Sequence, residues 1–512
     1  MIERALISVY DKSGLDEFAQ GLAELDYEIV SSGGTSAYLE EMGIAVTRIE
    51  DITQVPELLG GRVKTLHPRI HAAILARRDR PDDLSALEEH EIRPFDLVCV
   101  NLYPFRETVA RRGVREEEAV EVIDIGGPAM LRAAAKNFAH VVPVCRGPQY
   151  ERVLAELRRD GELSLDTRRA LAAEAFAVTA AYEASIAGWF MDRDTFPDRL
   201  IPAFEKVLDL SYGENPHQRA AYYAEIGTRR HLVSQVEQLH GRELSYNNLN
   251  DLNAARLCLR EFELPACVIV KHANPCGVAV AGSIEHAYER ALAADPVSAY
   301  GGVVVLNRPV SDELAGLLVE QFVEVLFAPR YDEGALETLA QKPATRILVD
   351  RERRRDAPGE RDYKRVLGGL LVQDRDWDIE DRVGMEIVCG SASETLWGDL
   401  LFAWRVCKHV TSNAIVLARD LQTLGVGAGQ MSRVDSVRIA LEKAREHDHS
   451  LKDAVLASDA FFPFADGPEL ALRAGVSAFI QPGGSKRDED VIAAVERAGA
   501  TMVFTHRRHF RH

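Results

Sequence analysis

The feature that most constrains the fold is an alternation of short apolar runs, helical segments and a glycine-rich turn at the start of the chain. Residues 4–9 form an apolar run typical of a buried strand, and residues 14–25 place apolar side chains at helical spacing. A second apolar pair at 29–30 leads into the glycine-rich turn 31–35, which another helical segment follows. Strands joined through helices predict a parallel sheet with helices on its faces.

The chain divides into three predicted α/β domains. Pro197 and Pro202 interrupt a largely helical stretch over 148–191, which places the first boundary near 195–203. A dense charge run over 351–365, typical of a solvated connector, marks the second. Further buried strands are predicted at 97–101, 141–144, 266–271, 302–306, 347–349, 414–418, 476–480 and 501–504. The domains are expected at 1–198, 199–365 and 366–512.

Composition and charge exclude several function classes. The 512 residues include 61 basic and 80 acidic side chains, a formal charge of −19, which argues against nucleic acid as the main partner but allows a local anion pocket. Seven scattered cysteines, none in a C-x-x-C pair, indicate a reducing compartment without a disulfide framework. No apolar run suits a signal peptide or a membrane span, so we expect a cytoplasmic protein with no membrane partner.

Three glycine-containing turns in the first domain together predict one anion pocket. They are Ser-Gly-Gly-Thr at 32–35, the segment 60–68 with its two cations, and Ile-Gly-Gly-Pro at 125–128. Glycine lets the backbone approach a ligand, and the N–H groups at a helix N-terminus favour an anion. Taken singly, the first is equally well a plain strand-to-helix turn, and the second is more often a solvated surface loop.

Several side chains near these turns suit proton chemistry: Lys12, Lys64, Tyr103, Asp124 and Lys136. Asp124 lies in an apolar run, where an unpaired carboxylate would be costly. The alternative is that Asp124 pairs with a helix N-terminus. Lys136 ends a helical run, where it could simply complement the helix dipole.

The second domain carries Lys271-His272 directly after a strongly apolar strand over 266–270. A histidine titrates near neutrality and suits general-base work, and the lysine can polarise an oxygen. The alternative is a loop that happens to begin with two basic residues. A zinc-deaminase site needs H-x-E and P-C-x-x-C; the segment 272–279 lacks the glutamate and the second cysteine, so zinc is not expected.

Three patches in the last domain are candidate ligand sites, and the second and third have two interpretations each. The glycine-rich segment 425–433 lacks the lysine and hydroxyl of a nucleoside-triphosphate loop. The aromatic run 461–464 is ordinary core or, beside Asp466, the wall of a flat aromatic ligand. The basic C-terminus 505–512 is a frayed tail or an arm that closes over an anion.

These motifs together resemble the bifunctional AICAR formyltransferase/IMP cyclohydrolase family of purine biosynthesis, and the resemblance covers the whole chain. The matching segments are 32–35, 60–68, Asn-Leu-Tyr-Pro-Phe at 101–105, Ile-Asp-Ile-Gly-Gly at 123–127, Lys-His-Ala-Asn-Pro-Cys-Gly at 271–277, Gly-Ala-Gly-Gln at 427–430 and Ser-Asp-Ala-Phe-Phe-Pro-Phe at 458–464. The resemblance implies formyl transfer from 10-formyltetrahydrofolate to AICAR, then closure of FAICAR to IMP with loss of water.

The resemblance also implies an architecture and a set of partners. The first domain would be a methylglyoxal-synthase-like parallel α/β layer, and the rest two zinc-free cytidine-deaminase-like α/β subdomains. The substrates would be AICAR, FAICAR and folate, with no zinc and with room for a monovalent cation. A homodimer is expected.

Residue roles follow from the matched positions. Lys271 and His272 match the transferase catalytic pair, and Asn413 matches the residue that holds the formyl group. The cyclohydrolase catalytic set would be Lys64, Tyr103, Asp124 and Lys136. The substrate-binding positions would be Lys12, Ser32, Gly34, Thr35, Arg62 and Thr65 in the cyclohydrolase, and Tyr212, Asn248, Arg433, Asp466 and Arg508 in the transferase.

Two departures from the family pattern bear on these expectations. Ser211 stands where the family usually has a substrate-contacting arginine, so either the transferase binds its ribotide more weakly or Arg508 carries more of that binding. Tyr10 replaces a serine near the cyclohydrolase pocket. Two other functions remain open at this stage. One is a non-catalytic nucleotide sensor, and the other is a cyclohydrolase with a decayed transferase half. A sensor would not need Lys271-His272 together with Asn413.

Overall fold

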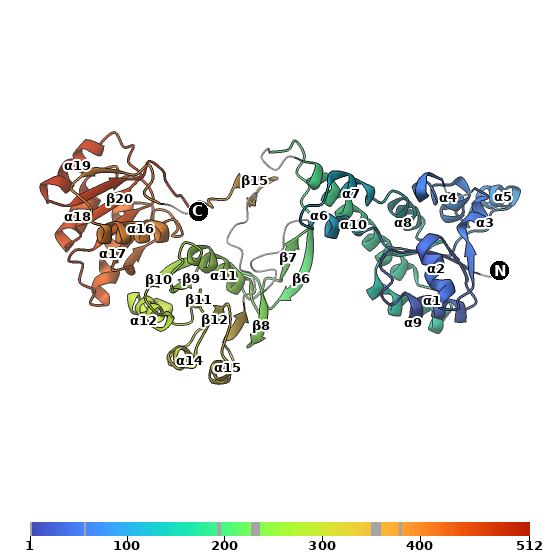
Figure 1. The fold of residues 1–512 in the computed structure, drawn as a ribbon, viewed down its shortest axis with the longest axis horizontal. Helices are drawn as coiled ribbons and strands as arrows, with labels where there is room; N and C mark the ends of the chain where they lie inside the picture. Colours follow the sequence, from blue (N-terminus) through green and yellow to red (C-terminus); the bar gives the residue numbers. More distant parts are fainter. Residues whose placement is uncertain (1–2, 56–57, 192–195, 227–235, 350–359, 378–380) are drawn as a thin grey trace. The chain divides into compact units, whose positions relative to one another are not determined.

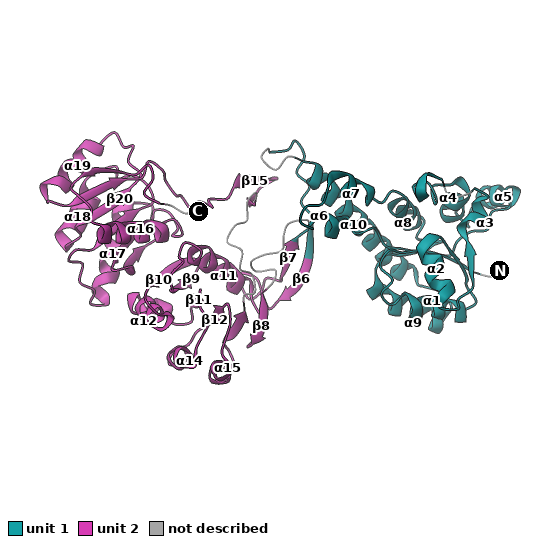
Figure 2. Ribbon diagram, viewed as in Figure 1, with its two compact units in different colours: residues 1–205, 225–229 teal, residues 206–224, 230–512 magenta. Residues whose placement is uncertain are grey.

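The computed structural model describes residues 3–55, 58–191, 196–226, 236–349, 360–377 and 381–512. It divides the chain into two compact units, coloured separately in Figure 2. Unit 1 is Met1–Glu205 with Glu225–Arg229, and unit 2 is Lys206–Ala224 with Arg230–His512. The predicted charged connector falls largely at 350–359, outside the described residues. The domain boundaries expected at 198 and 365 stay predictions.

Unit 1 is built on a five-stranded sheet in the order β3-β2-β1-β4-β5, and every pairing in it is parallel (Figure 1). The strands are β1 (Arg4–Ser8), β2 (Glu28–Ser31), β3 (Val46–Arg48), β4 (Leu97–Val100) and β5 (Val142–Val144). The helices are α1 (Leu15–Glu24), α2 (Gly33–Glu41), α3 (Ile49–Thr53), α4 (Pro68–Leu75), α5 (Pro81–Glu89), α6 (Phe105–Val109), α7 (Glu116–Glu121), α8 (Gly126–Lys136), α9 (Tyr150–Asp160) and α10 (Leu165–Phe190). The predicted parallel sheet is confirmed.

Two hydrophobic clusters cover the faces of this sheet, because successive residues of each strand point to opposite sides. On one face α1 and α9 meet β1, and the rings of Phe18 and Tyr150 stack with centroids 4.4 Å apart. On the other face Leu6 of β1 packs with residues of α4, α8 and α10. Helices on both faces leave the edge where the strands end as the place for a ligand.

The strand order changes direction at β1. The chain runs from β1 to β2 and β3 on one side, and it returns to place β4 and β5 on the other. The connections after β1 and β4 therefore diverge, which opens a crevice beyond the carboxyl ends of these strands. Residues 9–14 and 101–104 follow these two strands.

The helix α10 is long and apolar. By length and composition alone it could cross a membrane, contrary to the expectation from the sequence. Yet Leu171, Ala175 and Tyr182 of α10 are buried in unit 1, and a core helix passes the same test. The structure therefore uses α10 as a packing helix.

Unit 2 is built on a twelve-stranded mixed sheet whose two halves repeat the same succession of elements (Figure 1). The first half has β8 (Glu237–His240), α11 (Tyr246–Leu259), β9 (Ala266–Lys271), β10 (Asn274–Val280), α12 (Ile284–Ala294), α13 (Pro296–Ala299), β11 (Val303–Leu306), α14 (Asp312–Leu318), β12 (Val325–Ala328), α15 (Glu333–Leu339) and β13 (Arg346–Val349). The second has β16 (Glu386–Cys389), α16 (Glu394–Cys407), β17 (Ile415–Arg419), β18 (Gln422–Gly427), α17 (Arg433–Glu446), β19 (Val455–Ser458), α18 (Asp466–Ala474), β20 (Ala478–Gln481), α19 (Asp488–Arg497) and β21 (Thr501–Phe504).

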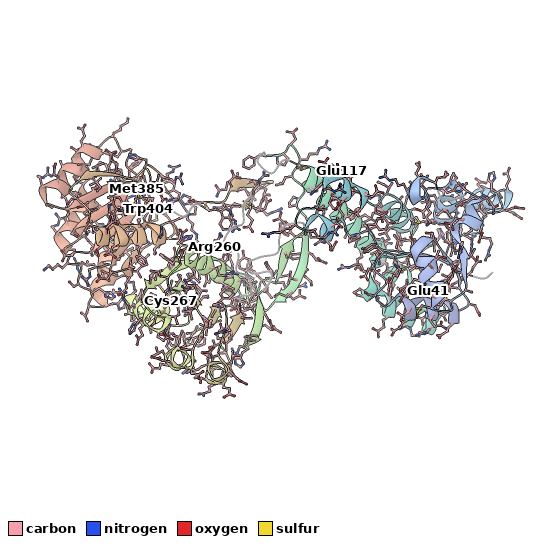
Figure 3. All side chains as sticks on the ribbon, in the orientation of Figure 1. Glu41, Glu117, Arg260, Cys267, Met385 and Trp404 are labelled. Atoms are coloured by element: carbon pink, nitrogen blue, oxygen red, sulfur yellow. The ribbon has the colours of Figure 1, made fainter. Side chains whose placement is uncertain are left out.

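Each half consists of an antiparallel hairpin, β9–β10 or β17–β18, followed by three parallel strands that helices connect. The halves join where β10 lies beside β18, with Ala279 opposite Gln422. One core cluster includes residues of both halves, and Trp404 of α16 is fully buried in it; Cys267 of β9 is fully buried in the neighbouring cluster (Figure 3). Small two-stranded sheets, β6 (Phe204–Leu210) with β7 (Ala220–Glu225) and β14 (Arg361–Val366) with β15 (Gly369–Asp374), complete the described strands.

We predict that Gly277→Ala destabilises unit 2. Gly277 of β10 faces the carbonyl oxygen of Ala291 in α12 so closely that an added Cβ would overlap it. The backbone of α12 at Ala291 cannot move aside without disturbing the helix, so we expect the free energy of unfolding to fall by about 1–3 kcal/mol. Gly282→Ala, whose Cβ would enter open space, is the control. Equal unfolding midpoints for the two variants in urea would contradict this packing.

Candidate functional site

The first candidate site lies at the carboxyl edge of the unit 1 sheet, where Asn101 ties two loops together. Its Oδ1 accepts hydrogen bonds from the backbone N–H groups of Tyr10 (2.6 Å) and Asp11 (3.1 Å). Its Nδ2 donates to the Asp11 carbonyl oxygen at 2.7 Å. The loop after β4 and the loop after β1 therefore hold each other beside the crevice where the strand order reverses.

The Ser-Gly-Gly-Thr turn lies beside these loops, between β2 and α2. The Thr35 hydroxyl donates to the Val9 carbonyl oxygen at 2.9 Å and accepts from the Val9 N–H at 3.1 Å, so it fixes the turn against the end of β1. No side chain caps α2, and a Cβ on Gly34 would meet nothing within 4 Å. An anion at this helix end would meet backbone N–H groups, as predicted for the pocket.

The structure brings Lys64 to this turn. Gly33 has φ of 53°, which favours glycine, and a Cβ there would collide with the Lys64 Nζ atom. The same Nζ lies 3.9 Å from Glu50 Oε1, and the lysine side chain is largely buried. A cation and a glycine-rich helix start thus meet, although they come from separate motifs of the sequence.

Asp124 precedes α8 and lies at the start of that helix. Its Oδ1 accepts from the Gly127 N–H at 2.8 Å, and the Thr65 hydroxyl lies against Gly126. Burial raises the pKa of Asp124, while hydrogen bonds from the Gly127 and Tyr103 backbones oppose the rise. Asp124 therefore pairs with a helix N-terminus, and it also lies beside the 60–68 segment. A buried carboxyl with a raised pKa is a common feature of proton-transfer sites.

Tyr182 of α10 is a site residue that the sequence did not reveal. Its hydroxyl accepts from the Asp124 N–H at 2.8 Å and donates to the Val122 carbonyl oxygen at 3.2 Å. Burial raises the pKa of Tyr182 to about 12, so the phenol stays protonated and keeps donating at neutral pH. This hydroxyl fixes the turn that carries Asp124. No pattern in the sequence predicts that α10 packs beside this turn.

Other predicted residues of the first site lie further out. Arg62 forms an exposed ion pair with Glu121 of α7. Lys136 is the exposed last residue of α8, about 15 Å from the helix start beside Asp124 at 1.5 Å per residue. The structure does not bring Lys136 to the cluster around Asp124.

Two aromatic contacts complete the rim of this site. The Tyr103 side chain is 49% exposed, and its ring meets the ring of Tyr10 edge to face at 5.9 Å. Lys12 has its Nζ 5.9 Å from the ring centroid of Tyr38 in α2. Tyr10, the departure from the family pattern, therefore contacts a predicted catalytic residue.

The second candidate site begins at the turn between β9 and β10. Lys271 pairs with Asn274 across the hairpin, so His272 and Ala273 form a two-residue turn with φ of 51° and 59°. Such turns usually carry glycine or asparagine, because other side chains strain in the left-handed region. The turn presents His272 to solvent. The Lys271 Nζ donates to the carbonyl oxygens of Tyr300 and Gly301, both at 2.9 Å, which fixes the ammonium.

Asn274 links this turn to the loop that carries Asn413. Its Oδ1 accepts from the Thr411 N–H at 2.8 Å, and its Nδ2 donates to the His272 carbonyl oxygen at 3.2 Å. The two segments come from different halves of unit 2. The Lys-His turn and Asn413 thus belong to one hydrogen-bonded region, as the resemblance implies.

Asn413 is oriented by its neighbours. Its Nδ2 donates to the carbonyl oxygens of Gln430 (2.8 Å) and Met431 (3.3 Å), and its Oδ1 accepts from Arg433 Nη2 at 2.8 Å. Arg433 is itself buried and forms an ion pair with Asp459, which is fully buried. The Asp459 carboxylate neutralises the charge of Arg433. The role of Arg433 that the structure shows is therefore to orient Asn413, rather than to offer an unpaired positive charge to a ligand.

A cavity of about 710 Å³ lies next to Asn413. Its lining includes three phenylalanines of the predicted aromatic run, three predicted binding residues and one further aromatic residue: Phe461, Phe462 and Phe464; Arg433, Asp466 and Arg508; and Phe510. The Asp466 Oδ1 accepts from the Gly467 N–H at 2.8 Å at the start of α18. The Arg508 guanidinium lies 4.5 Å from the ring centroid of Phe510. The C-terminus is therefore part of a cavity wall.

Asn248 and Ser211 have local structural roles. Asn248 and Ser245 form a capping box at the start of α11, with N···O distances of 2.9 and 3.2 Å, so the Asn248 side-chain oxygen is engaged. The Ser211 hydroxyl donates to the Leu244 carbonyl oxygen at 3.2 Å. The Tyr212 carbonyl oxygen accepts from the Tyr246 N–H at 3.1 Å. These contacts place Ser211, Tyr212 and Asn248 at one helix start. Arg508, the other predicted ribotide residue, lines the cavity beside Asn413 instead.

The described residues contain no group of three or more His, Cys, Asp or Glu side chains arranged to hold a metal. Burial raises the pKa of Cys276, the one cysteine beside the Lys-His turn, to about 12.

Comparisons with known proteins identify relatives over the whole chain. The family model described as AICARFT/IMPCHase bienzyme matches residues 134–443, and the MGS-like domain model matches residues 14–129. The chain is 50% identical over 516 residues to the "Bifunctional purine biosynthesis protein PurH" of Anoxybacillus flavithermus, with 100% of both chains covered. The crystal structure of ForH is 39% identical over 37% of this chain and 100% of that chain; its TM-score of 0.33 is too low to support an argument about the fold.

We predict that Tyr182→Phe destabilises unit 1 by about 1–3 kcal/mol, because the partly buried Asp124 N–H loses its acceptor. Tyr150→Phe is the matched control, since among the described residues that buried hydroxyl has one hydrogen-bond contact, with the Cys99 thiol at 3.7 Å. The two variants are compared by urea unfolding monitored by circular dichroism. A smaller loss for Tyr182→Phe than for Tyr150→Phe would show that Tyr182 does not hold the turn.

Proposed function

The chain belongs to the AICARFT/IMPCHase bienzyme family, and on that premise we propose how its two units divide the two reactions of the family. The protein is a bifunctional enzyme of purine biosynthesis that formylates AICAR and closes FAICAR to IMP. We assign formyl transfer to unit 2 and ring closure to unit 1. The observation that carries this assignment is the Lys271-His272 turn, which Asn274 ties to the loop of Asn413.

In formyl transfer, His272 takes a proton from the 5-amino group of AICAR as that nitrogen attacks the formyl carbon of 10-formyltetrahydrofolate. The bond from this carbon to N10 of the folate then breaks, and N10 takes up a proton, which releases FAICAR and tetrahydrofolate. His272 is exposed at the tip of its turn, where a substrate can reach it. The ammonium of Lys271 has three N–H donors, and two of them are directed to backbone carbonyls. The third can stabilise the negative charge that develops on the formyl oxygen.

The folate cosubstrate fits the cavity beside Asn413. Phe461, Phe464 and Phe510 offer flat apolar surface for a pterin ring, and Asp466 offers a carboxylate for its N–H groups. The 3.3 Å bond from Asn413 to Met431 is the weaker of its two amide contacts. A formyl oxygen can therefore replace Met431 as acceptor without disturbing the bonds that orient Asn413.

In ring closure, the ribotide phosphate binds at the start of α2, where Lys64 adds a positive charge. We propose that Asp124 and Tyr103, which the hydrogen bond from the Tyr103 backbone to Asp124 holds side by side, face the formylated carboxamide as it folds back on itself. The raised pKa of Asp124 suits a group that exchanges protons during dehydration. Lys136 stays a prediction, because it lies at the other end of α8.

The enzyme is further proposed to be a cytoplasmic homodimer that uses no zinc, with room for a monovalent cation. The charge of −19 supports the absence of a nucleic-acid partner, and the packing of α10 in unit 1 supports the absence of a membrane partner. A non-catalytic sensor does not account for full-length similarity to a bifunctional enzyme.

We predict that His272→Ala lowers the kcat of formyl transfer by about 10²–10⁴, the usual cost of losing a general base. Cyclisation of supplied FAICAR should stay at its original rate, since the cyclohydrolase residues are in the other unit. His286→Ala, an exposed histidine of α12, is the control. Parallel loss of both activities in a folded His272→Ala protein would disprove the division of labour.

The Ser211 departure yields a separate prediction. With serine in place of the usual arginine, Arg508 should carry a larger share of ribotide binding. Arg508→Ala should raise the KM for AICAR about 10- to 100-fold, equivalent to losing a charged hydrogen bond, and Ser211→Arg should lower it. Arg507→Ala serves as control. If Arg508→Ala changes only the KM for the folate, Arg508 belongs to the folate cavity alone.

A further inference from the structure

The turn that carries His272 is held in a conformation its residues disfavour. Both His272 and Ala273 lie in the left-handed region, at φ of 51° and 59°. Glycine adopts such angles freely, whereas a side chain with a Cβ meets the neighbouring carbonyl oxygen. Some interaction outside the hairpin must therefore stabilise the turn.

That interaction comes from Asp251, a residue of α11 outside every motif of the catalytic set. Its Oδ1 accepts from the Ala273 N–H at 2.7 Å. The His272 N–H also bonds to this carboxylate. Burial raises the pKa of Asp251, and the two turn N–H groups with the charges of His272 and Lys271 oppose the rise. The carboxylate thus contacts the backbone of the turn and leaves the imidazole to solvent.

The second half of unit 2 contains the same arrangement without a histidine. Asp420 and Leu421 form the turn between β17 and β18, with φ of 54° and 58°. Asp399 of α16 accepts from their N–H groups at 3.0 and 2.8 Å. Asp251 and Asp399 are each the sixth residue of a 14-residue helix that precedes its hairpin. We call such a helix carboxylate, which accepts hydrogen bonds from both N–H groups of a left-handed turn, a turn clamp. The repeat therefore offers an internal control, because the turn that Asp399 clamps carries no proposed catalytic residue.

We propose that Asp251 is a positioning residue for formyl transfer: its carboxylate holds the His272–Ala273 turn in the left-handed conformation and thereby aims His272 at the substrate amine. The inference rests on the role of His272 proposed above. Loss of the clamp lets the turn relax toward negative φ, which swings the imidazole away from the hairpin tip. Loss of the clamp at Asp399 moves Asp420, whose side chain takes part in no proposed step.

The test compares Asp251→Asn with Asp399→Asn in the full chain. An asparagine can accept one turn N–H, but its NH₂ group opposes the other. Asp251→Asn should lower the kcat of formyl transfer about 10- to 100-fold, the scale of a misplaced catalytic group. The KM for AICAR and the cyclisation of FAICAR should stay within about twofold. Asp399→Asn should lower the melting temperature comparably and leave kcat within about twofold.

Two further variants separate positioning from simple loss of structure. Ala273→Gly in the Asp251→Asn background should restore several-fold of the lost kcat, because glycine tolerates positive φ without a clamp. Asp251→Glu keeps the charge and should fold, yet its longer side chain should displace the turn and lower kcat.

Wild-type kcat in both Asp251→Asn and Asp251→Glu would overturn the proposal, as would equal losses of kcat in Asp251→Asn and Asp399→Asn. His272→Ala distinguishes this failure from a wrong function. If His272→Ala abolishes transfer while the Asp251 variants do not, only the positioning role fails. If His272→Ala transfers normally, the proposed role of His272 fails as well.

Discussion

Side-chain oxygens that accept hydrogen bonds from turn N–H groups are the interaction on which both candidate sites depend. A turn at the end of a strand has N–H groups that no neighbouring strand satisfies, and leaving them buried and unpaired is costly. Asn101 accepts hydrogen bonds from N–H groups of the loop after β1, and Asp124 accepts one at the start of α8. Asp251 and Asp399 accept them from the turns of the two hairpins of unit 2. Each acceptor fixes a backbone position, and the proposed catalytic side chains Tyr103 and His272 are carried on that backbone.

The repeated architecture of unit 2 explains how one half can specialise. Both halves keep the helix carboxylate, the left-handed turn and the glycine that packs on a helix carbonyl, Gly277 or Gly425. These features concern the backbone, so they persist whatever side chain the turn presents. One turn presents His272 next to an anchored lysine. The other presents Asp420, whose carbonyl oxygen accepts from Arg290 of the first half, so that turn helps to join the halves.

The sequence predicts the parts of this structure that depend on local pattern. Continuous apolar runs locate β4 and β9 within a residue, because buried strands need apolar side chains on both faces. The four-residue strand β12 was missed, since so short a run does not distinguish strand from helix. Tyr182, Asp251 and Asp459 could not be predicted as site residues, because their partners lie far away in the chain. For the same reason, the neutralisation of Arg433 by Asp459 had no signal in the sequence.

The central claim is that the clamped Lys-His turn forms the formyl-transfer site together with the loop of Asn413. A crystal structure of the full chain with AICAR and a non-reactive folate analogue tests this most directly. We expect an imidazole nitrogen of His272 within about 3 Å of the AICAR 5-amino nitrogen. We also expect the pterin in the cavity beside Asp466 and the Asp251–Ala273 hydrogen bond to be retained. An AICAR amine beyond hydrogen-bond reach of His272, or a turn that has relaxed to negative φ, would contradict it.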